Sequence, residues 1–134
     1  MALFGGIKDS AAIDDEGRIL YVSEKFHLNP KLLIEAIYLP NKEKAVSVVM
    51  CSKSVLALSS CGHVYETENK INLSFKPVPD LKGKELVRLS GIDNCVFVIN
   101  AKGRVFVRGS NDFGRLGLKD CVNYFTEIFG YYHL

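Results

Sequence analysis

The sequence is poor in features that mark membrane, secreted and zinc-binding proteins. It has no apolar run near the ~20 residues that a membrane-spanning helix needs. Its first residues have neither a basic start nor a long apolar stretch, so we expect no secretory signal. Its four cysteines include no Cys-x-x-Cys pair, which argues against a zinc knuckle or a thioredoxin-like motif. We therefore expect free thiols in an intracellular protein, cytoplasmic or nuclear, without membrane contact.

Net charge is also scarce, because the 134 residues carry a formal charge of only +2. That is too little to indicate a polyanion partner by itself, and nucleic acid is not expected as a direct ligand. Hydrophobic residues make up 48% of the chain and charged residues 24%, which is typical of a folded protein. Residues 101–119 differ, with five basic side chains against Asp112 alone. Either a solvated strand face or a binding patch accounts for such a segment.

The motifs of common enzymes are missing too. There is no Gly-x-x-x-x-Gly-Lys-[Ser/Thr] phosphate loop and no Gly-x-Ser-x-Gly nucleophile elbow. Of the three histidines only His63 has a cysteine close by, Cys61, and no second ligand pair follows. The acidic residues 14–16 precede Gly17 and are typical of a solvated turn. We therefore predict that the protein is not an enzyme and has no catalytic, cofactor-binding or metal-binding residues.

What the sequence does contain is an internal repeat. Ala45–Tyr65 aligns with Leu86–Phe106 at a shift of 41 residues, and apolar and turn positions coincide. A weaker copy, Ala11–Leu20, aligns with Leu56–Tyr65 at a shift of 45. Repeats of about forty residues with short strands are typical of propeller blades or a related β array. The prediction is a single repeat domain over residues 1–134, with copies at approximately 5–44, 45–85 and 86–134.

Each of the two better copies predicts three strands. The second strand is apolar on consecutive positions, as in Val55–Leu58, and the third carries apolar residues on both faces. A sheet with one wet face does not need this pattern, whereas a sheet packed between two others does. The expected strands are 45–50 and 86–89, then 55–58 and 96–99, then 18–22, 63–67 and 104–108.

Glycines are expected to shape the turns. In the repeat register, one glycine of each copy stands just before the third strand, where a positive φ closes a tight hairpin. Further glycines and an asparagine follow the third strand of the last copy, where they would hold a loop against the sheet. The predicted structural turn residues are Gly17, Gly62, Gly103, Gly109, Asn111, Gly114 and Gly117.

One segment allows two interpretations. Asn29–Leu39 begins with an N-cap residue and a proline, and its apolar spacing is compatible with a helix. The repeat register instead makes Ile37 equivalent to Val78, in an extended link. A short helix near residues 30–39 would fit the extra four residues that separate the two repeat shifts. Both interpretations stay open at this point.

Gly103–Leu118 resembles the signature of the regulator of chromosome condensation repeat family: a glycine and a hydrophobic strand before Gly-x-Asn-x-x-Gly-x-Leu-Gly. The resemblance implies an all-β fold built of antiparallel blades. The family's rings have about seven blades, and this chain has material for about two to three, so we expect an incomplete β-propeller. Arg108 stands where many members have tryptophan, which this chain lacks. An open stack leaves strand edges unpaired. Another chain would complete it, a partner would cap it, or it belongs to a larger protein.

These features predict a noncatalytic protein–protein interaction or scaffold module that packs with, or is completed by, another chain. We expect a protein partner or a homo-oligomer, and no cofactor. The resemblance also implies two alternatives, nucleotide exchange on a small GTPase and chromatin docking, although a fold does not determine a function. Arginine and aromatic residues often anchor interfaces. The candidate protein-binding residues are Arg104, Arg108, Phe113 and Arg115.

Overall fold

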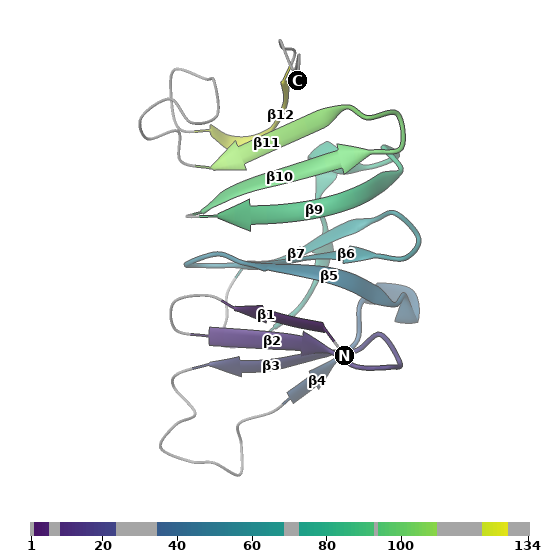
Figure 1. Cartoon of the computed structure of the whole chain (residues 1–134), viewed down its shortest axis with the longest axis vertical. Coiled ribbons are helices and arrows are strands. Elements are labelled where there is room, and N and C mark those ends of the chain that lie inside the picture. The colour runs from purple at the N-terminus through teal and green to yellow at the C-terminus, as the bar shows by residue number, and fades with distance from the viewer. Residues whose placement is uncertain are drawn as a thin grey trace.

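The computed structural model describes residues 2–5, 9–23, 35–68, 73–92, 94–109 and 122–128. They form three four-stranded antiparallel sheets (Figure 1). The first sheet consists of β1 (Ala2–Gly5), β2 (Asp9–Ile13), β3 (Ile19–Ser23) and β4 (Glu35–Ile37). The middle sheet consists of β5 (Ala45–Met50), β6 (Val55–Ser59), β7 (Val64–Thr67) and β8 (Lys76–Pro77). The third sheet consists of β9 (Leu86–Ile92), β10 (Cys95–Asn100), β11 (Val105–Gly109) and β12 (Val122–Ile128).

The sheets stack face to face, and the middle sheet lies between the other two (Figure 1). Strand β6 shows the physical basis, because all five of its residues are buried. Successive side chains of a strand point to opposite faces. Val55 and Ala57 accordingly pack in the core shared with the first sheet, and Leu56 and Leu58 pack in the core shared with the third. The prediction that consecutive apolar residues indicate two covered faces is confirmed.

The repeat also determines which residues meet the next sheet. We call the face that each sheet turns toward the following sheet its forward face. At three equivalent positions, the forward-face residues of the first two sheets are at most 7% exposed. In the first sheet these residues are Ala11, Ile13 and Ile19, and their repeat equivalents in the middle sheet are Leu56, Leu58 and Val64.

One polar side chain organises each hairpin turn. Asp14 Oδ1 accepts the backbone N–H groups of Glu16 at 3.0 Å and Arg18 at 2.8 Å. At the equivalent positions, Ser59 Oγ and Asn100 Oδ1 accept N–H groups from the residues two and four places later, at 2.9–3.2 Å. These side chains satisfy backbone donors that the tight turn leaves without a strand partner. Three chemically different residues therefore build the same turn.

The turn glycines also join one sheet to the next. The carbonyl of Gly17 accepts the N–H of Ala45 at 3.0 Å, and the carbonyl of Gly62 accepts the N–H of Leu86 at 3.0 Å. Gly17 has a φ of 79°, and a Cβ placed on it would lie 2.5 Å from Lys44 Cβ. The glycine is thus required twice, by its backbone conformation and by the close approach of the next sheet.

The helix considered near residues 30–39 is not formed by Glu35–Ile37, which are strand β4, and residues 30–34 lie outside the described ranges. The reason is pairing along β3, where Ile37 lies opposite Ile19. The repeat equivalents of these two residues are paired in the same way, because Val78 donates its N–H to the carbonyl of Val64. Ile37 and Val78 therefore both lie in extended segments, as the repeat register predicted. An edge partner for β3 outweighs the local helical spacing.

Two 3₁₀ helices, η3 (Pro40–Lys42) and η4 (Pro79–Leu81), connect successive sheets. Each begins with proline, whose missing N–H does no harm at that position. Within the described ranges, no helix has the length and apolar character needed to cross a membrane.

We predict that Gly17→Ala destabilises the protein more than Gly103→Ala does. Both residues have positive φ, which costs alanine about 1–2 kcal/mol. A Cβ at Gly17 also collides with Lys44, whereas a Cβ at Gly103 meets no atom within 4 Å. Overpacking adds about 1–3 kcal/mol to the first variant alone. Urea unfolding of both variants measures the difference, and equal losses would contradict the inter-sheet role of Gly17.

Candidate protein-interaction surface

The forward face of the third sheet is apolar. It includes Phe97, Ile99 and Val105, the repeat equivalents of Leu56, Leu58 and Val64, together with Cys95 and Val107. Phe97 and Val105 surround the buried Cys95 and Val107, and Ile128 of β12 joins them. Ile99 follows Phe97 by two positions and therefore lies on the same face. The sequence has built this face with the same type of residue that packs against a following sheet in the first two copies.

Exposure separates three positions of this face from their equivalents, whereas Cys95 and Val107 on the same face are fully buried. The forward faces of the first and middle sheets are buried by the sheet that follows. Phe97, Ile99 and Val105 are only half-buried. The turn glycines differ in the same way. A Cβ at Gly103 would meet no atom within 4 Å, whereas Gly17 and Gly62 both contact the next sheet. Within the described residues, the third sheet therefore has a contact surface that no fourth sheet covers.

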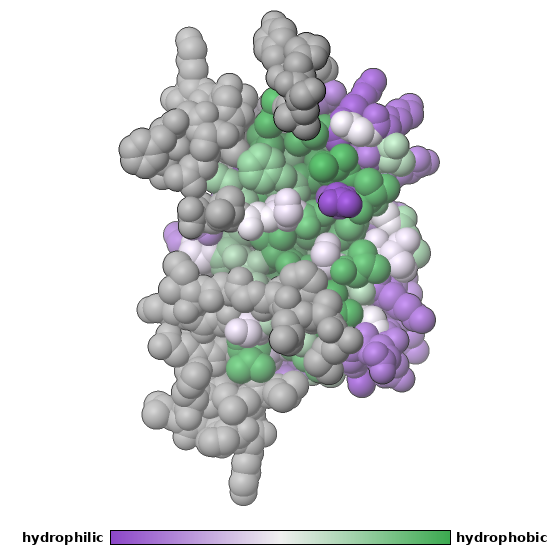
Figure 2. All heavy atoms as spheres, viewed as in Figure 1, coloured by the Kyte–Doolittle hydropathy of each residue, from purple (hydrophilic) through white to green (hydrophobic). Residues whose placement is uncertain are grey.

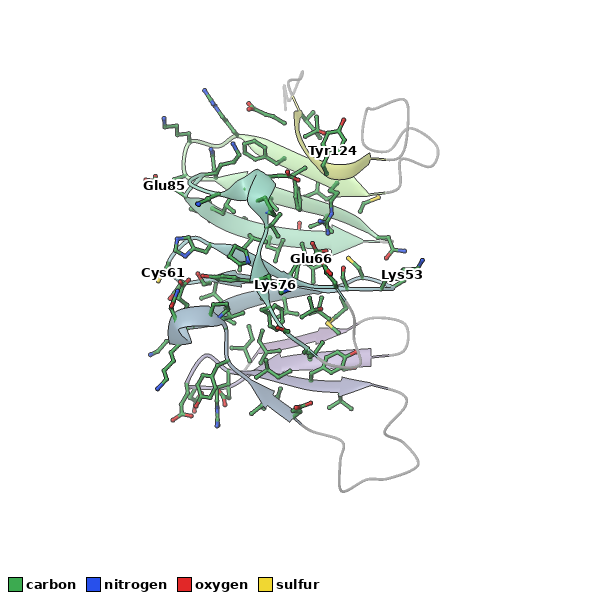
Figure 3. The ribbon with its side chains drawn as sticks, turned by 180° about the vertical axis from the view of Figure 1, so that it is seen from behind. Lys53, Cys61, Glu66, Lys76, Glu85 and Tyr124 are labelled. Atoms are coloured by element: carbon green, nitrogen blue, oxygen red, sulfur yellow. The ribbon has the colours of Figure 1, made fainter. Side chains whose placement is uncertain are left out.

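Arg108, predicted as a partner-binding residue, is used inside the protein. Its guanidinium donates to both carboxylate oxygens of Glu66, at 2.9 and 2.5 Å, and so joins the third sheet to the middle sheet. Figure 3 shows Glu66 on the middle sheet, beneath the third. Ser54 Oγ also donates to Glu66, at 3.0 Å, and the guanidinium lies 4.9 Å from the ring centre of Phe125.

The environment of Arg108 fixes its charge. Burial alone would lower the pKa of Arg108, but its hydrogen bonds and charge attraction to Glu66 raise the pKa above the ordinary value. The two side chains are 17% and 22% exposed. A bidentate pair at this depth orients the two sheets. Arg108 therefore makes an inter-sheet contact, and its binding to a partner stays a prediction.

The other predicted protein-binding residues have different places. Arg104 lies at the surface, with a side chain 60% exposed and its Nε 3.9 Å from Glu127 Oε2. Phe113 and Arg115 lie outside the described residues. Arg104 is therefore the residue of this set that the structure shows to be accessible.

The predicted turn glycines can be placed in part. Gly17, Gly62 and Gly103 have φ of 79°, 84° and 83°, and Gly109 has φ of 127°. At Gly109 an added Cβ would lie 2.0 Å from the carbonyl oxygen of Asn94, so β11 approaches the start of β10 too closely for any side chain. Asn111, Gly114 and Gly117 lie outside the described residues.

Sequence reasoning missed a polar cluster around Glu43. This carboxylate, 10% exposed, accepts hydrogen bonds from Ser59 Oγ at 2.7 Å and Tyr65 OH at 2.7 Å, and His63 Nδ1 lies 2.9 Å away. The serine and the histidine both bond the acid, so the geometry is not that of a nucleophile beside a base. Among the described residues, no three His, Cys, Asp or Glu side chains are grouped as a metal site requires.

The cluster sets two pKa values. Burial alone would raise the pKa of Glu43, but the hydrogen bonds from Ser59, Tyr65 and His63 leave it below its ordinary value. Burial and the Glu43 carboxylate raise the pKa of Tyr65 to about 12. Glu43 precedes β5 and its three partners come from the β6–β7 hairpin, so the cluster ties that hairpin to the start of its own sheet. No local sequence pattern indicates this cluster, because Glu43 lies 16–22 residues before its partners along the chain.

Stacked four-stranded antiparallel sheets with one repeated register are the blades of a β-propeller. The predicted all-β fold, an incomplete propeller, is confirmed. The chain is similar to human WBSCR16, with a TM-score of 0.77 and 15% identity over 96% of this chain and 39% of that one.

Two further structures have the same fold. Prp20p of Saccharomyces cerevisiae, whose crystal structure was reported with its binding properties to Gsp1p and histones, has a TM-score of 0.72 at 20% identity over 87% of this chain and 34% of that one. A chain of the complex of Kap60 with yeast RCC1 (Prp20) has a TM-score of 0.73 at 17% identity over 95% of this chain and 37% of that one. The resemblance to the regulator of chromosome condensation repeat family is confirmed at the level of the fold.

The present chain spans 34–39% of the length of these three proteins. No family model and no curated protein matches its sequence.

We predict that Arg108→Met lowers the free energy of unfolding by about 1.5–3 kcal/mol, because Glu66 loses its charged partner between two sheets. Both side chains are partly exposed to solvent, which weakens their attraction, so we expect a value toward the lower end of this range. The matched variant Arg104→Met should change stability by less than about 0.5 kcal/mol. Urea unfolding measures both, and equal effects would contradict the inter-sheet role of Arg108.

We predict that Glu43 stabilises the fold in an acid-sensitive way. Its pKa is lowered on folding, so its contribution is complete above the ordinary value of 4.5 and is lost as the pH falls through the folded value. The stability difference between the wild type and Glu43→Gln should therefore shrink below pH 4.5. Urea unfolding at several pH values tests this, and a difference that stays constant into acid would contradict it.

Proposed function

We propose that the protein is a noncatalytic interaction module whose third sheet packs, by its forward face, against an antiparallel sheet of another polypeptide. The observation that carries the proposal is the half-buried apolar set Phe97, Ile99 and Val105 at positions whose equivalents are buried in both other sheets. Apolar burial is the main driving force of such association.

Two features support a sheet as the occupant. The equivalent forward faces of this chain are each covered by a four-stranded sheet, in the same register. The carbonyls of Gly17 and Gly62 each accept the first N–H of the next sheet, and at the equivalent Gly103 an added Cβ would meet no atom within 4 Å. A strand that begins there would gain the same hydrogen bond.

The remaining functional predictions have less support. Nucleotide exchange on a small GTPase and chromatin docking stay predictions, because a shared fold does not transfer an activity. A nucleotide-release assay with a panel of purified small GTPases tests the first of them. The intracellular location also stays a prediction.

The experiment uses two variants and a matched control. Phe97→Glu places a charge on the forward face, and Val87→Glu places the same charge at a valine that is already 54% exposed. In a solution of the purified chain, the sheet that can pack against the forward face is that of a second copy of the chain. Light scattering across a concentration series gives the mass.

We expect a wild-type mass above the 14.9 kDa of one chain that rises with concentration. Loss of the burial of one large apolar side chain is worth about 1.5–3 kcal/mol, so Phe97→Glu should weaken association by about tenfold or more. Val87→Glu should behave like the wild type. A wild type that stays at the mass of one chain, or a control that dissociates as much as Phe97→Glu, would sink the proposal.

A further inference from the structure

A basic residue follows each hairpin glycine in the repeat register: Arg18, His63 and Arg104. Two of the three are paired with carboxylates of the chain itself. Arg18 Nε lies 2.6 Å from Asp14 Oδ2 and 3.1 Å from Glu16 Oε2. His63 Nδ1 lies 2.9 Å from Glu43 Oε1. The position following the hairpin glycine is thus a place where the protein brings a carboxylate to a basic side chain.

Arg104 differs from its two equivalents. Its side chain is 60% exposed, and the ion pair it makes within the described residues is to Glu127 at 3.9 Å, the limit of such a contact. The repeat explains the difference. The residue equivalent to Glu43, which holds His63, is Lys84. The third sheet therefore has the base Lys84 at the position where the middle sheet has the acid Glu43.

Basic side chains outnumber acidic ones around Arg104. The Lys84 ammonium lies 5.0 Å from the ring centre of Phe106, which takes the place of Tyr65 and has no hydroxyl to donate. Lys102 is exposed in the same turn. Two acids lie beside these bases: Glu127, and the exposed Glu85, whose carbonyl accepts the N–H of Ala101 in the same turn at 2.9 Å. Figure 3 shows Glu85 and Cys61 at this end of the stack and Lys53 at the other. Figure 2 shows hydrophilic side chains gathered along this turn end of the stack.

We propose that Lys84, Lys102 and Arg104 form a docking site for an acidic segment of a protein partner, which supplies the carboxylates that the first two hairpins take from their own chain. Carboxylate is favoured over phosphate because both occupied equivalents hold carboxylates. A segment with several acidic residues is required, since a single exposed ion pair contributes little. The site lies at the turn end and does not depend on packing at the forward face.

The test measures the binding of a fluorescein-labelled polyglutamate peptide to the purified chain by fluorescence anisotropy at low salt. Arg104→Glu and Lys84→Glu reverse charges in the site. Lys76→Glu makes the same change at an exposed lysine of β8 and is the matched control. Circular dichroism melting establishes that each variant is folded before binding is measured.

We expect each site variant to weaken peptide binding by about tenfold, and both together by more, with less than about twofold loss for the control. Added salt should weaken the wild-type complex. The proposal is overturned by absence of peptide binding, by equal losses in Lys76→Glu, or by tighter site-dependent binding of duplex DNA than of the peptide. The last outcome would assign the site to phosphates.

Discussion

Face-to-face packing of apolar sheets is the interaction on which the structure depends. The middle sheet has no polar face, because alternate residues of β6 enter the cores on its two sides. Such a sheet is stable only when both faces are covered. The position of each sheet, the register of each hairpin and the exposure of each forward face follow from this requirement. It is also the reason why we propose that the forward face of the third sheet packs against another sheet.

The repeat conserves contacts more strictly than residue types. Aspartate, serine and asparagine build the same turn from Asp14, Ser59 and Asn100. The charged residues beside the turns differ more. Glu43 and Lys84 occupy one repeat position with opposite charges. A stack of similar sheets can thus present different chemistry at each of its turns.

Much of the fold could be predicted from the sequence because it is written in local patterns. Consecutive apolar residues in Val55–Leu58 predicted two covered faces, and the register predicted the strands. Contacts between distant side chains could not be predicted. Arg108 was expected at the surface, yet it reaches Glu66, 42 residues away and on another sheet. The helical spacing before Leu39 failed to predict Glu35–Ile37 for a related reason, since pairing of β4 with β3 decides those residues.

A photoreactive benzoylphenylalanine in place of Phe97 identifies what covers the forward face of the third sheet, with the same substitution at Val87 for comparison. After irradiation of the purified chain in solution, we expect a covalent product that joins position 97 to strand residues of a second polypeptide, and little such product from position 87. Products from position 97 that remain within a single chain, or equal intermolecular yields from both positions, would contradict the claim that this face packs against another sheet.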